Sequence, residues 1–179
     1  MKSETVTNLV KILGDMKSLK RKGWIYRNVN DSESDAEHCF SLAMLVLLLA
    51  PKKLDLLKCL KMALLHDVPE IFCGDFVPGE IDETTKHNIE CEAMDKVVSL
   101  LERADFRELF EEFENKSSDE AKFVWALDRL DNVFTARYYE NNQGISLVEE
   151  FSQGAYARAE TLDEDMKNKL FDILSSLRS

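Results

Sequence analysis

The chain has 179 residues, of which 45% are apolar and 32% charged, and these proportions exclude a disordered, a collagen-like or a membrane-embedded protein. Only 6 glycines and 3 prolines occur, too few for an all-β fold of many short strands, so we expect long helices in one domain. The formal net charge of -11 excludes the basic surface of a general nucleic-acid binder.

Two stretches in the first fifty positions carry apolar residues at helical spacing. Residues 4–19 show the pattern of an amphipathic helix. Residues 20–34 have no periodicity, which predicts a loop long enough to be functional. Ser34 and Glu37 have the spacing of a capping box, so a helix is predicted to begin there and to end before Pro51.

The middle of the chain is predicted to be helical, with one long turn. An apolar helix is expected over residues 54–72, which places His66 and Asp67 near its middle. Residues 73–82 contain two glycines and a proline and predict a turn region. Two further helices are predicted over residues 84–101 and 105–114.

The last third of the chain completes the helical pattern. Ser117 and Glu120 form a second capping box, which predicts a helix over residues 119–140. The final helix is predicted to be capped by Thr161. The last two helices are expected over residues 146–160 and 163–177. No repeat or Gly/Ser linker is visible, so we predict an all-α, single-domain bundle of about seven to eight helices over residues 1–179.

Cysteine usage and apolar run length indicate the cellular environment. No two cysteines have the spacing of a zinc or redox motif, so we interpret them as small buried hydrophobic residues rather than a disulfide framework. The first 19 residues carry charges that a signal peptide would not contain. The longest near-apolar run, residues 39–51, is shorter than the roughly 20 residues of a membrane span. We therefore expect a cytoplasmic protein with no membrane partner.

Two histidines and two aspartates occupy unusual positions. His66 and Asp67 are adjacent within an apolar run, Asp128 lies within another, and His38 follows the first capping box. A buried ionised carboxylate is costly unless it is paired or binds a metal. Taken singly, each of these residues is a helix cap, an ion-pair partner or a core hydrogen-bonding group. Two imidazoles and two carboxylates together suit a divalent transition metal.

The order His38, His66-Asp67, Asp128 resembles the H…HD…D pattern of the HD-domain metal-dependent phosphohydrolases. Residues 8–140 are similar to the small HD-domain 5′-deoxynucleotidases, in the segments GWIYRNVNDSESDAEH, ALLHDVPEIFCGDFVP and EEFENKSSDEAKFVWALDRLD. This resemblance implies a helical bundle of the HD-domain type. Its metal-site core would cover about residues 20–140, with C-terminal helices over about 146–177 packed on it.

The resemblance also implies roles for particular residues. The implied metal ligands are His38, His66, Asp67 and Asp128. Asp67 and Glu70 are the implied catalytic residues, with Glu70 suited to orient or deprotonate the attacking water. A second metal or a bound water is expected at Glu70, Asp75 and the main chain of Phe76.

Substrate contacts are expected in the segment before the first ligand. The resemblance places Trp24 beside the nucleotide, and Arg27 is suited to bind the phosphate with Asp75 nearby. The alternatives are loop packing for Trp24 and a surface salt bridge for Arg27. Some bacterial members carry Arg just before the tryptophan, where this chain has Gly23, so the nucleotide contact there differs.

The expected activity is hydrolysis of deoxynucleoside 5′-monophosphates to deoxynucleoside and phosphate. The expected cofactor is a divalent cation: Mn, Co, Fe, Ni or Zn. We expect a small-molecule nucleotide substrate, no nucleic-acid polymer as partner, and a homodimer. Two alternatives stay open: a phosphodiesterase or nucleoside-triphosphate hydrolase of the same superfamily, and a non-catalytic, metal-stabilised nucleotide-binding protein.

Overall fold

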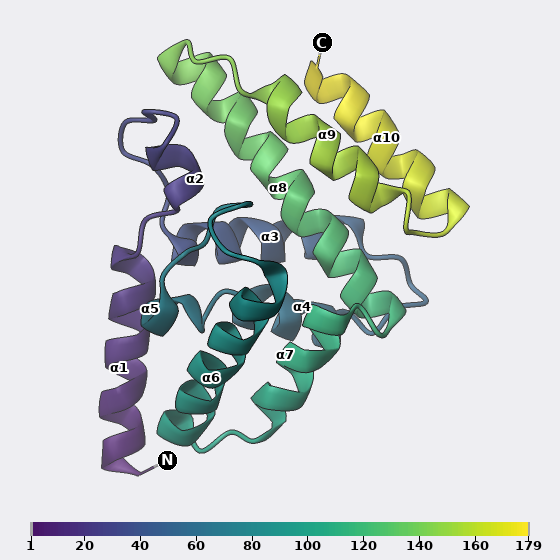
Figure 1. The fold of residues 1–179 in the computed structure, drawn as a ribbon. Coiled ribbons are helices and arrows are strands. Elements are labelled where there is room, and N and C mark those ends of the chain that lie inside the picture. The colour runs from purple at the N-terminus through teal and green to yellow at the C-terminus, as the bar shows by residue number, and fades with distance from the viewer. Residues whose placement is uncertain (1, 179) are drawn as a thin grey trace. The chain divides into compact units, whose positions relative to one another are not determined.

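The computed structural model describes residues 2–178, and Figure 1 shows that helices make up most of this part of the chain. Ten helical segments lie within it, and eight of them have ten or more residues, which confirms the all-α prediction. In chain order they are α1 (Ser3–Ser18), α2 (Lys22–Ile25), α3 (Asp35–Leu49), α4 (Leu56–Leu65), α5 (Glu70–Cys73), α6 (Glu83–Leu101), α7 (Asp105–Asn115), α8 (Asp119–Gln143), α9 (Val148–Ala159) and α10 (Glu164–Arg178).

The chain forms two compact units. The first contains the residues up to Phe40 together with Leu64–Glu111. The second contains Ser41–Ala63 together with the residues from Glu112 onward. The helices α3, α4 and α7 contribute residues to both units.

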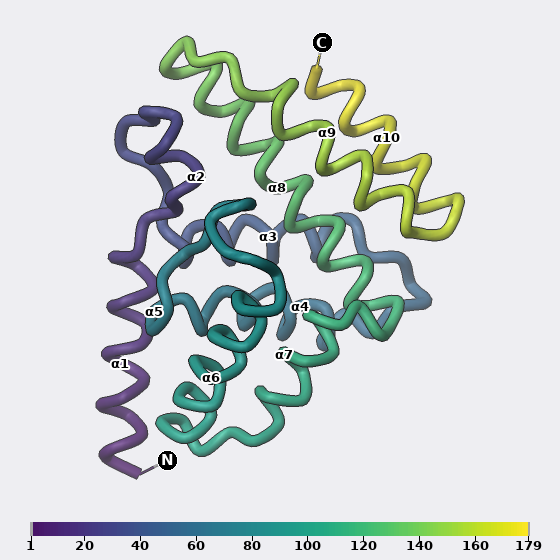
Figure 2. The backbone as a smooth tube through the Cα atoms, in the orientation of Figure 1, coloured from purple at the N-terminus to yellow at the C-terminus, as the bar shows by residue number. Residues whose placement is uncertain are grey.

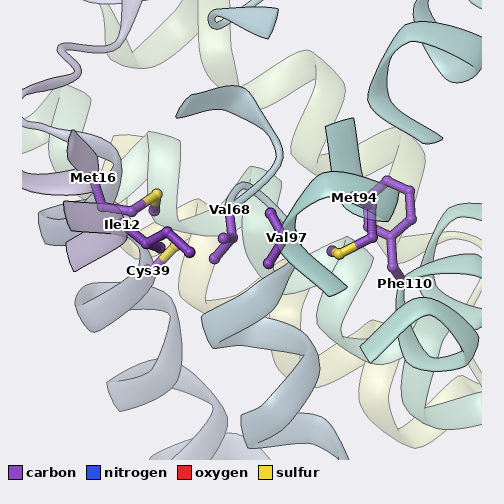
Figure 3. Packing of buried hydrophobic residues seen from close by; sticks show 7 residues of the cluster. All are labelled: Ile12, Met16, Cys39, Val68, Met94, Val97 and Phe110. Carbon is purple, nitrogen blue, oxygen red and sulfur yellow. The ribbon is translucent and has the colours of Figure 1, made fainter. Parts of the chain in front are cut away.

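The core of the first unit fixes the backbone beside two predicted metal ligands. Figure 3 shows its buried cluster, made of Ile12, Met16, Cys39, Val68, Met94, Val97 and Phe110. Burying a large apolar side chain stabilises a fold by about 1.5–3 kcal/mol, so this cluster holds α1, α6 and α7 against the start of α3 and the turn after α4. Cys39 directly follows His38, and Val68 directly follows Asp67. The core therefore anchors the chain at both ligand positions.

In the second unit, α8, α9 and α10 pack against one another, and their traces run side by side in Figure 2. The α8 helix begins at Ser118, whose side chain accepts a hydrogen bond from the Ala121 N–H at 3.1 Å. The prediction that Ser117 caps this helix was therefore wrong by one residue. The helix ends at Gly144, which has φ 69°, a conformation that glycine adopts at little cost.

The predicted helix over residues 54–72 is interrupted in the structure. The α4 helix ends at Leu65, residues 66–69 form a turn, and α5 begins only at Glu70. Pro69 has no N–H to donate to the preceding helical turn, and it disfavours helical geometry in the residue before it. His66 and Asp67 therefore lie in a turn, and their spacing from Glu70 is not that of a continuous helix.

Other local predictions had mixed outcomes. The capping box of Ser34 and Glu37 is confirmed: the Ser34 N–H donates to Glu37 Oε2 at 2.7 Å. The predicted loop over residues 20–34 contains the short helix α2. The cap of α10 is Asp163, whose carboxylate accepts from the Met166 N–H at 3.2 Å, and not Thr161.

The expectation of four buried cysteines is met at two positions. The four cysteines are free; Cys39 and Cys59 are buried, whereas Cys73 and Cys91 are half-buried. None of the helices within residues 2–178 is both long enough and apolar enough to cross a membrane.

Candidate metal centre

Three predicted ligands converge in the first unit. His38 lies in the first turn of α3, where its N–H donates to the Ser34 carbonyl at 3.0 Å, and its side chain is fully buried. The turn after α4 brings His66 opposite it, with the two Nε2 atoms 3.3 Å apart. Asp67 joins them, with Oδ1 3.2 Å from His66 Nε2 and Oδ2 3.5 Å from His38 Nε2.

This set of donor atoms fits a divalent transition metal. One ring nitrogen from each histidine and one oxygen of Asp67 all lie within 4.8 Å of one another. A neutral imidazole has one donor and one acceptor nitrogen, so two facing Nε2 atoms can share one proton or together face one cation. Imidazole and carboxylate ligands suit Mn, Fe, Co, Ni and Zn alike. The buried residues present here therefore fit the metal that the sequence implied.

The charges of this cluster reinforce one another. Burial alone would lower the pKa of His66, but the adjacent Asp67 carboxylate outweighs it and raises that pKa well above its ordinary value. Burial acts on Asp67 in the opposite sense; His66 and Arg21 outweigh it and hold the pKa of Asp67 well below its usual range. The carboxylate of Asp67 is thus ionised, as a metal ligand must be.

Arg21 is a member of this centre that the sequence analysis did not identify. Its Nη1 donates to Asp67 Oδ2 at 2.6 Å, with side-chain exposures of 15% for Arg21 and 13% for Asp67. The same Nη1 atom lies 3.7 Å from Asp35 Oδ1, which is too far for a hydrogen bond. Arg21 therefore compensates the buried negative charge of Asp67, which the sequence analysis expected to need a partner.

A group of buried acidic residues shares Asp67 with the His/Asp cluster. Asp35, Asp67 and Glu70 each offer an oxygen within 4.8 Å of the others. Both carboxylate oxygens of Asp35 and the Oε2 of Glu70 are buried without a hydrogen-bond partner. Burial, aided by the neighbouring Asp67, raises the pKa of Asp35 to about 7. Burial also raises the pKa of Glu70 well above its usual value, with Asp67 and Asp75 adding to the effect.

Asp75 ties the turn after α5 to α2. It is buried, and its Oδ2 accepts a hydrogen bond from the backbone N–H of Lys22 at 2.6 Å. The Lys22 ammonium lies 5.6 Å from the centre of the Phe76 ring. Since Lys22 follows Arg21 directly, two successive residues contact two different acids of the centre.

The two predicted nucleotide contacts, Trp24 and Arg27, lie in and just after α2. Trp24 is 1% exposed, and its indole N–H donates to Glu33 Oε1 at 2.8 Å, which favours the packing alternative for this residue. Arg27 is half-buried, and its Nη1 donates to the Gly23 carbonyl at 2.6 Å. Arg27 therefore contacts Gly23, the position at which some bacterial members of the family carry Arg.

Asp128, the remaining predicted ligand, belongs to the second unit. It lies on α8 and is half-buried. Its Oδ2 accepts a hydrogen bond from Arg158 Nη1 at 2.5 Å. Its place among the metal ligands stays a prediction.

Comparisons with known proteins define the class of this protein. The family model described as HD domain matches residues 13–169. The 5′-deoxynucleotidase HDDC2 of Mus musculus is 37% identical, with the match covering 74% of this chain and 68% of that protein. The 5′-deoxynucleotidase hdd1 of Schizosaccharomyces pombe is 29% identical over 97% of this chain and 90% of that protein.

A solved structure extends the similarity to the whole fold. The PH0347 protein from Pyrococcus horikoshii OT3 matches with a TM-score of 0.81 and 31% identity, covering 96% of this chain and 97% of that one. The chain therefore belongs to the HD-domain family. Members of this family are metal-dependent phosphohydrolases, and the His/Asp cluster described above is where this chain can bind its metal.

Proposed function

We propose that this hydrolase cleaves deoxynucleoside 5′-monophosphates into deoxynucleoside and phosphate with the aid of a divalent cation. The observation that carries the proposal is the convergence of His38, His66 and Asp67 within 4.8 Å, at buried positions of an HD-domain chain. The similarity to curated 5′-deoxynucleotidases supports the choice of substrate over phosphodiesters and nucleoside triphosphates.

In this proposal, His38, His66 and Asp67 hold the cation, and Asp128 supplies a fourth ligand. A bound divalent cation supplies Lewis-acid stabilisation of the charge that develops on the phosphoryl oxygens. Mn²⁺ and Co²⁺ are the first cations to test. Arg21 holds Asp67 in its ionised form through the 2.6 Å hydrogen bond.

Glu70 is the proposed general base. Its buried, unpartnered Oε2 is able to accept a proton from the attacking water, and its raised pKa brings it closer to the working pH of such a base. Together with Asp75 and the main chain of Phe76, Glu70 is also proposed to bind a second cation or a water molecule. Asp67 is also proposed to contribute to catalysis. It is the one residue common to the group of His38, His66 and Asp67 and to the group of Asp35, Asp67 and Glu70.

Arg27 is the proposed nucleotide contact, with Asp75 contributing from the turn after α5. Arg27 presents a guanidinium that suits a phosphate, and the nearest atom to a Cβ placed on Gly23 would be Arg27 Nη1 at 4.0 Å. The missing side chain at Gly23 thus leaves room beside this guanidinium. Trp24 supports the same segment from within, through its bond to Glu33.

The remaining parts of the proposal concern the whole protein. Residues 1–179 act as a single HD domain, with a metal-site core over about residues 20–140. The protein works in the cytoplasm as a homodimer. The apolar side chains exposed on α3 support the homodimer, because Phe40 is 66% exposed and Leu48 is 71% exposed.

The activity is tested with purified protein and added Mn²⁺ or Co²⁺. The substrates are deoxy- and ribonucleoside 5′-monophosphates, the matching triphosphates and a phosphodiester. We expect inorganic phosphate and a nucleoside from the deoxynucleoside monophosphates. Release of pyrophosphate or tripolyphosphate, or diester cleavage alone, would support the alternatives; no phosphate release from any monophosphate would rule the proposal out.

Paired glutamate variants test the role of Glu70. Glu70→Gln is expected to lower turnover by at least about 100-fold, the contribution typical of a general base. Glu90→Gln is the matched control, since Glu90 is also buried but pairs with Lys86 on α6 at 2.9 Å. Equal losses in the two variants would contradict the assignment.

A further inference from the structure

The side chain of Arg158, on α9, contacts one turn of α8. Its Nη1 donates to the Asp128 carboxylate at 2.5 Å and to the Trp125 carbonyl at 2.7 Å. The guanidinium carbon lies 4.3 Å from the centre of the Trp125 ring. These contacts lie within the second unit, where α8 and α9 pack along each other.

The contacts hold Arg158 in one orientation. Its side chain is 16% exposed, so little of the guanidinium is hydrated. The carbonyl fixes one nitrogen, and the indole ring fixes the plane of the group. An arginine restrained in this way presents the same donor to Asp128 at all times, unlike a flexible surface ion pair.

We propose that Arg158 is a positioning residue, which holds the Asp128 carboxylate by Oδ2 in the orientation that a divalent cation requires. The inference rests on the proposed function, in which Asp128 is a metal ligand. Carboxylates that bind metals are commonly hydrogen-bonded by neighbouring side chains, and loss of such a neighbour typically costs about 10- to 100-fold in metal affinity or activity. On this basis α9, a helix outside the H…HD…D pattern, holds the Asp128 side chain in place.

The three contacts also explain why an arginine is suited to this position. A lysine ammonium is a compact charge without a plane, so it cannot stack on Trp125 as a guanidinium does. Arg158→Lys is therefore expected to keep a positive charge beside Asp128 but to restrain the orientation of the Asp128 carboxylate less. Arg158→Met removes the charge and the donors but retains much of the apolar stem.

Metal affinity is the readout, measured as free Mn²⁺ by electron paramagnetic resonance during titration of the full chain. Arg158→Met is expected to weaken Mn²⁺ binding by about 10- to 100-fold, and Arg158→Lys by less. Arg178→Met is the control, because Arg178 pairs with Glu149 at 2.8 Å on the exposed surface of the same unit. This control is expected to bind Mn²⁺ like the unchanged protein.

A double-mutant cycle separates a positioning role from a general structural one. Asp128→Asn removes the ligand charge, and Arg158→Met is then expected to have no further effect on Mn²⁺ affinity. A full additional loss in the double variant would overturn the inference, as would unchanged or tighter Mn²⁺ binding in Arg158→Met. Tighter binding would show that Arg158 competes with the cation for Asp128.

The same measurements distinguish this inference from the proposed function. If Asp128→Asn weakens Mn²⁺ binding but neither Arg158 variant does, the positioning role is wrong and the metal site stands. If Asp128→Asn leaves Mn²⁺ binding unchanged, Asp128 is not a ligand, and both statements about it fail. Urea unfolding in the presence of EDTA identifies variants that do not fold, and Arg158→Lys then carries the test.

Discussion

The guanidinium of Arg21 donates a hydrogen bond to the carboxylate of Asp67 across 46 positions of the sequence, with Nη1 and Oδ2 2.6 Å apart. Both side chains are largely buried. Asp67 therefore has a cationic partner supplied by the protein itself. A divalent cation at this centre has to share Asp67 with Arg21.

Arg21→Met is expected to destabilise the metal-free protein by about 3–5 kcal/mol, because it leaves a buried carboxylate without its partner. Added Mn²⁺ is expected to restore part of this loss, since a bound cation replaces the missing charge. Urea unfolding with EDTA and with Mn²⁺ measures both effects. Arg103→Met is the control: its pair with Asp105 is exposed, so its removal is expected to have little effect on stability. If Arg21→Met lost as little stability as Arg103→Met, Arg21 would not be the residue that compensates the charge of Asp67.

Asp35→Asn is expected to stabilise the metal-free protein by about 1–3 kcal/mol. Both oxygens of Asp35 are buried without a hydrogen-bond partner, and a buried polar group that makes no hydrogen bond costs about this much. The Asn side chain removes the charge and adds an amide donor that faces Asp67 and Glu70. The same change is expected to weaken divalent-cation binding, because it removes a nearby negative charge. Urea unfolding in EDTA measures the first effect; a loss of stability there would show that Asp35 is satisfied in solution.

His66→Ala is expected to remove the stabilisation that Mn²⁺ gives to the unchanged protein, because it removes one of the two facing Nε2 donors. Mn²⁺ raises Tm only as far as it binds the folded chain, so thermal unfolding with and without the cation is the measurement. His87→Ala is the matched control, as His87 is a half-buried histidine whose Nε2 contacts Cys91 Sγ at 3.4 Å. A Mn²⁺ response that survives in His66→Ala would exclude this histidine as a ligand. Loss of the Mn²⁺ response in a protein that shows no turnover with His66 intact would favour the non-catalytic, metal-stabilised alternative.

Ser118→Ala is expected to cost about 1 kcal/mol of stability, the usual effect of removing an N-cap side chain. Ser117→Ala is expected to change stability by less than about 0.5 kcal/mol, since the Ser117 hydroxyl contacts only the Glu112 carbonyl at 3.5 Å. Paired urea unfolding curves compare the two serines directly. A larger effect at Ser117 would restore the capping box that the sequence predicts.

Features set by neighbouring residues could be predicted from the sequence. The start of α3 is one such feature, because Ser34 and Glu37 form their capping box within one helical turn. The resemblance to the H…HD…D pattern implied that the two histidines and Asp67 bind one metal, and the structure brings these three residues together. The break at residues 66–69 was missed because the apolar pattern continues through it, and only Pro69 marks the interruption.

Features set by long-range packing could not be predicted. The sequence indicated that Asp67 needs compensation, but nothing local identifies Arg21, which lies in an aperiodic segment far away in the chain. Asp35 was missed for a different reason. An acidic residue in the first turn of a helix is typical of a solvent-exposed position that favours the helix dipole, whereas here the side chain is fully buried. Arg158 likewise lies outside every recognised segment.

The chain has two tryptophans, and each lies beside an arginine of interest. Trp24 is buried three residues after Arg21, and Trp125 stacks under Arg158. Indole emission responds to nearby charge, and each unit contains one tryptophan. Trp24→Phe leaves only the reporter next to Asp128, and Trp125→Phe leaves only the one next to Arg21. Single-tryptophan variants thus make it possible to follow the arrival of a cation in the two units separately, without an attached dye.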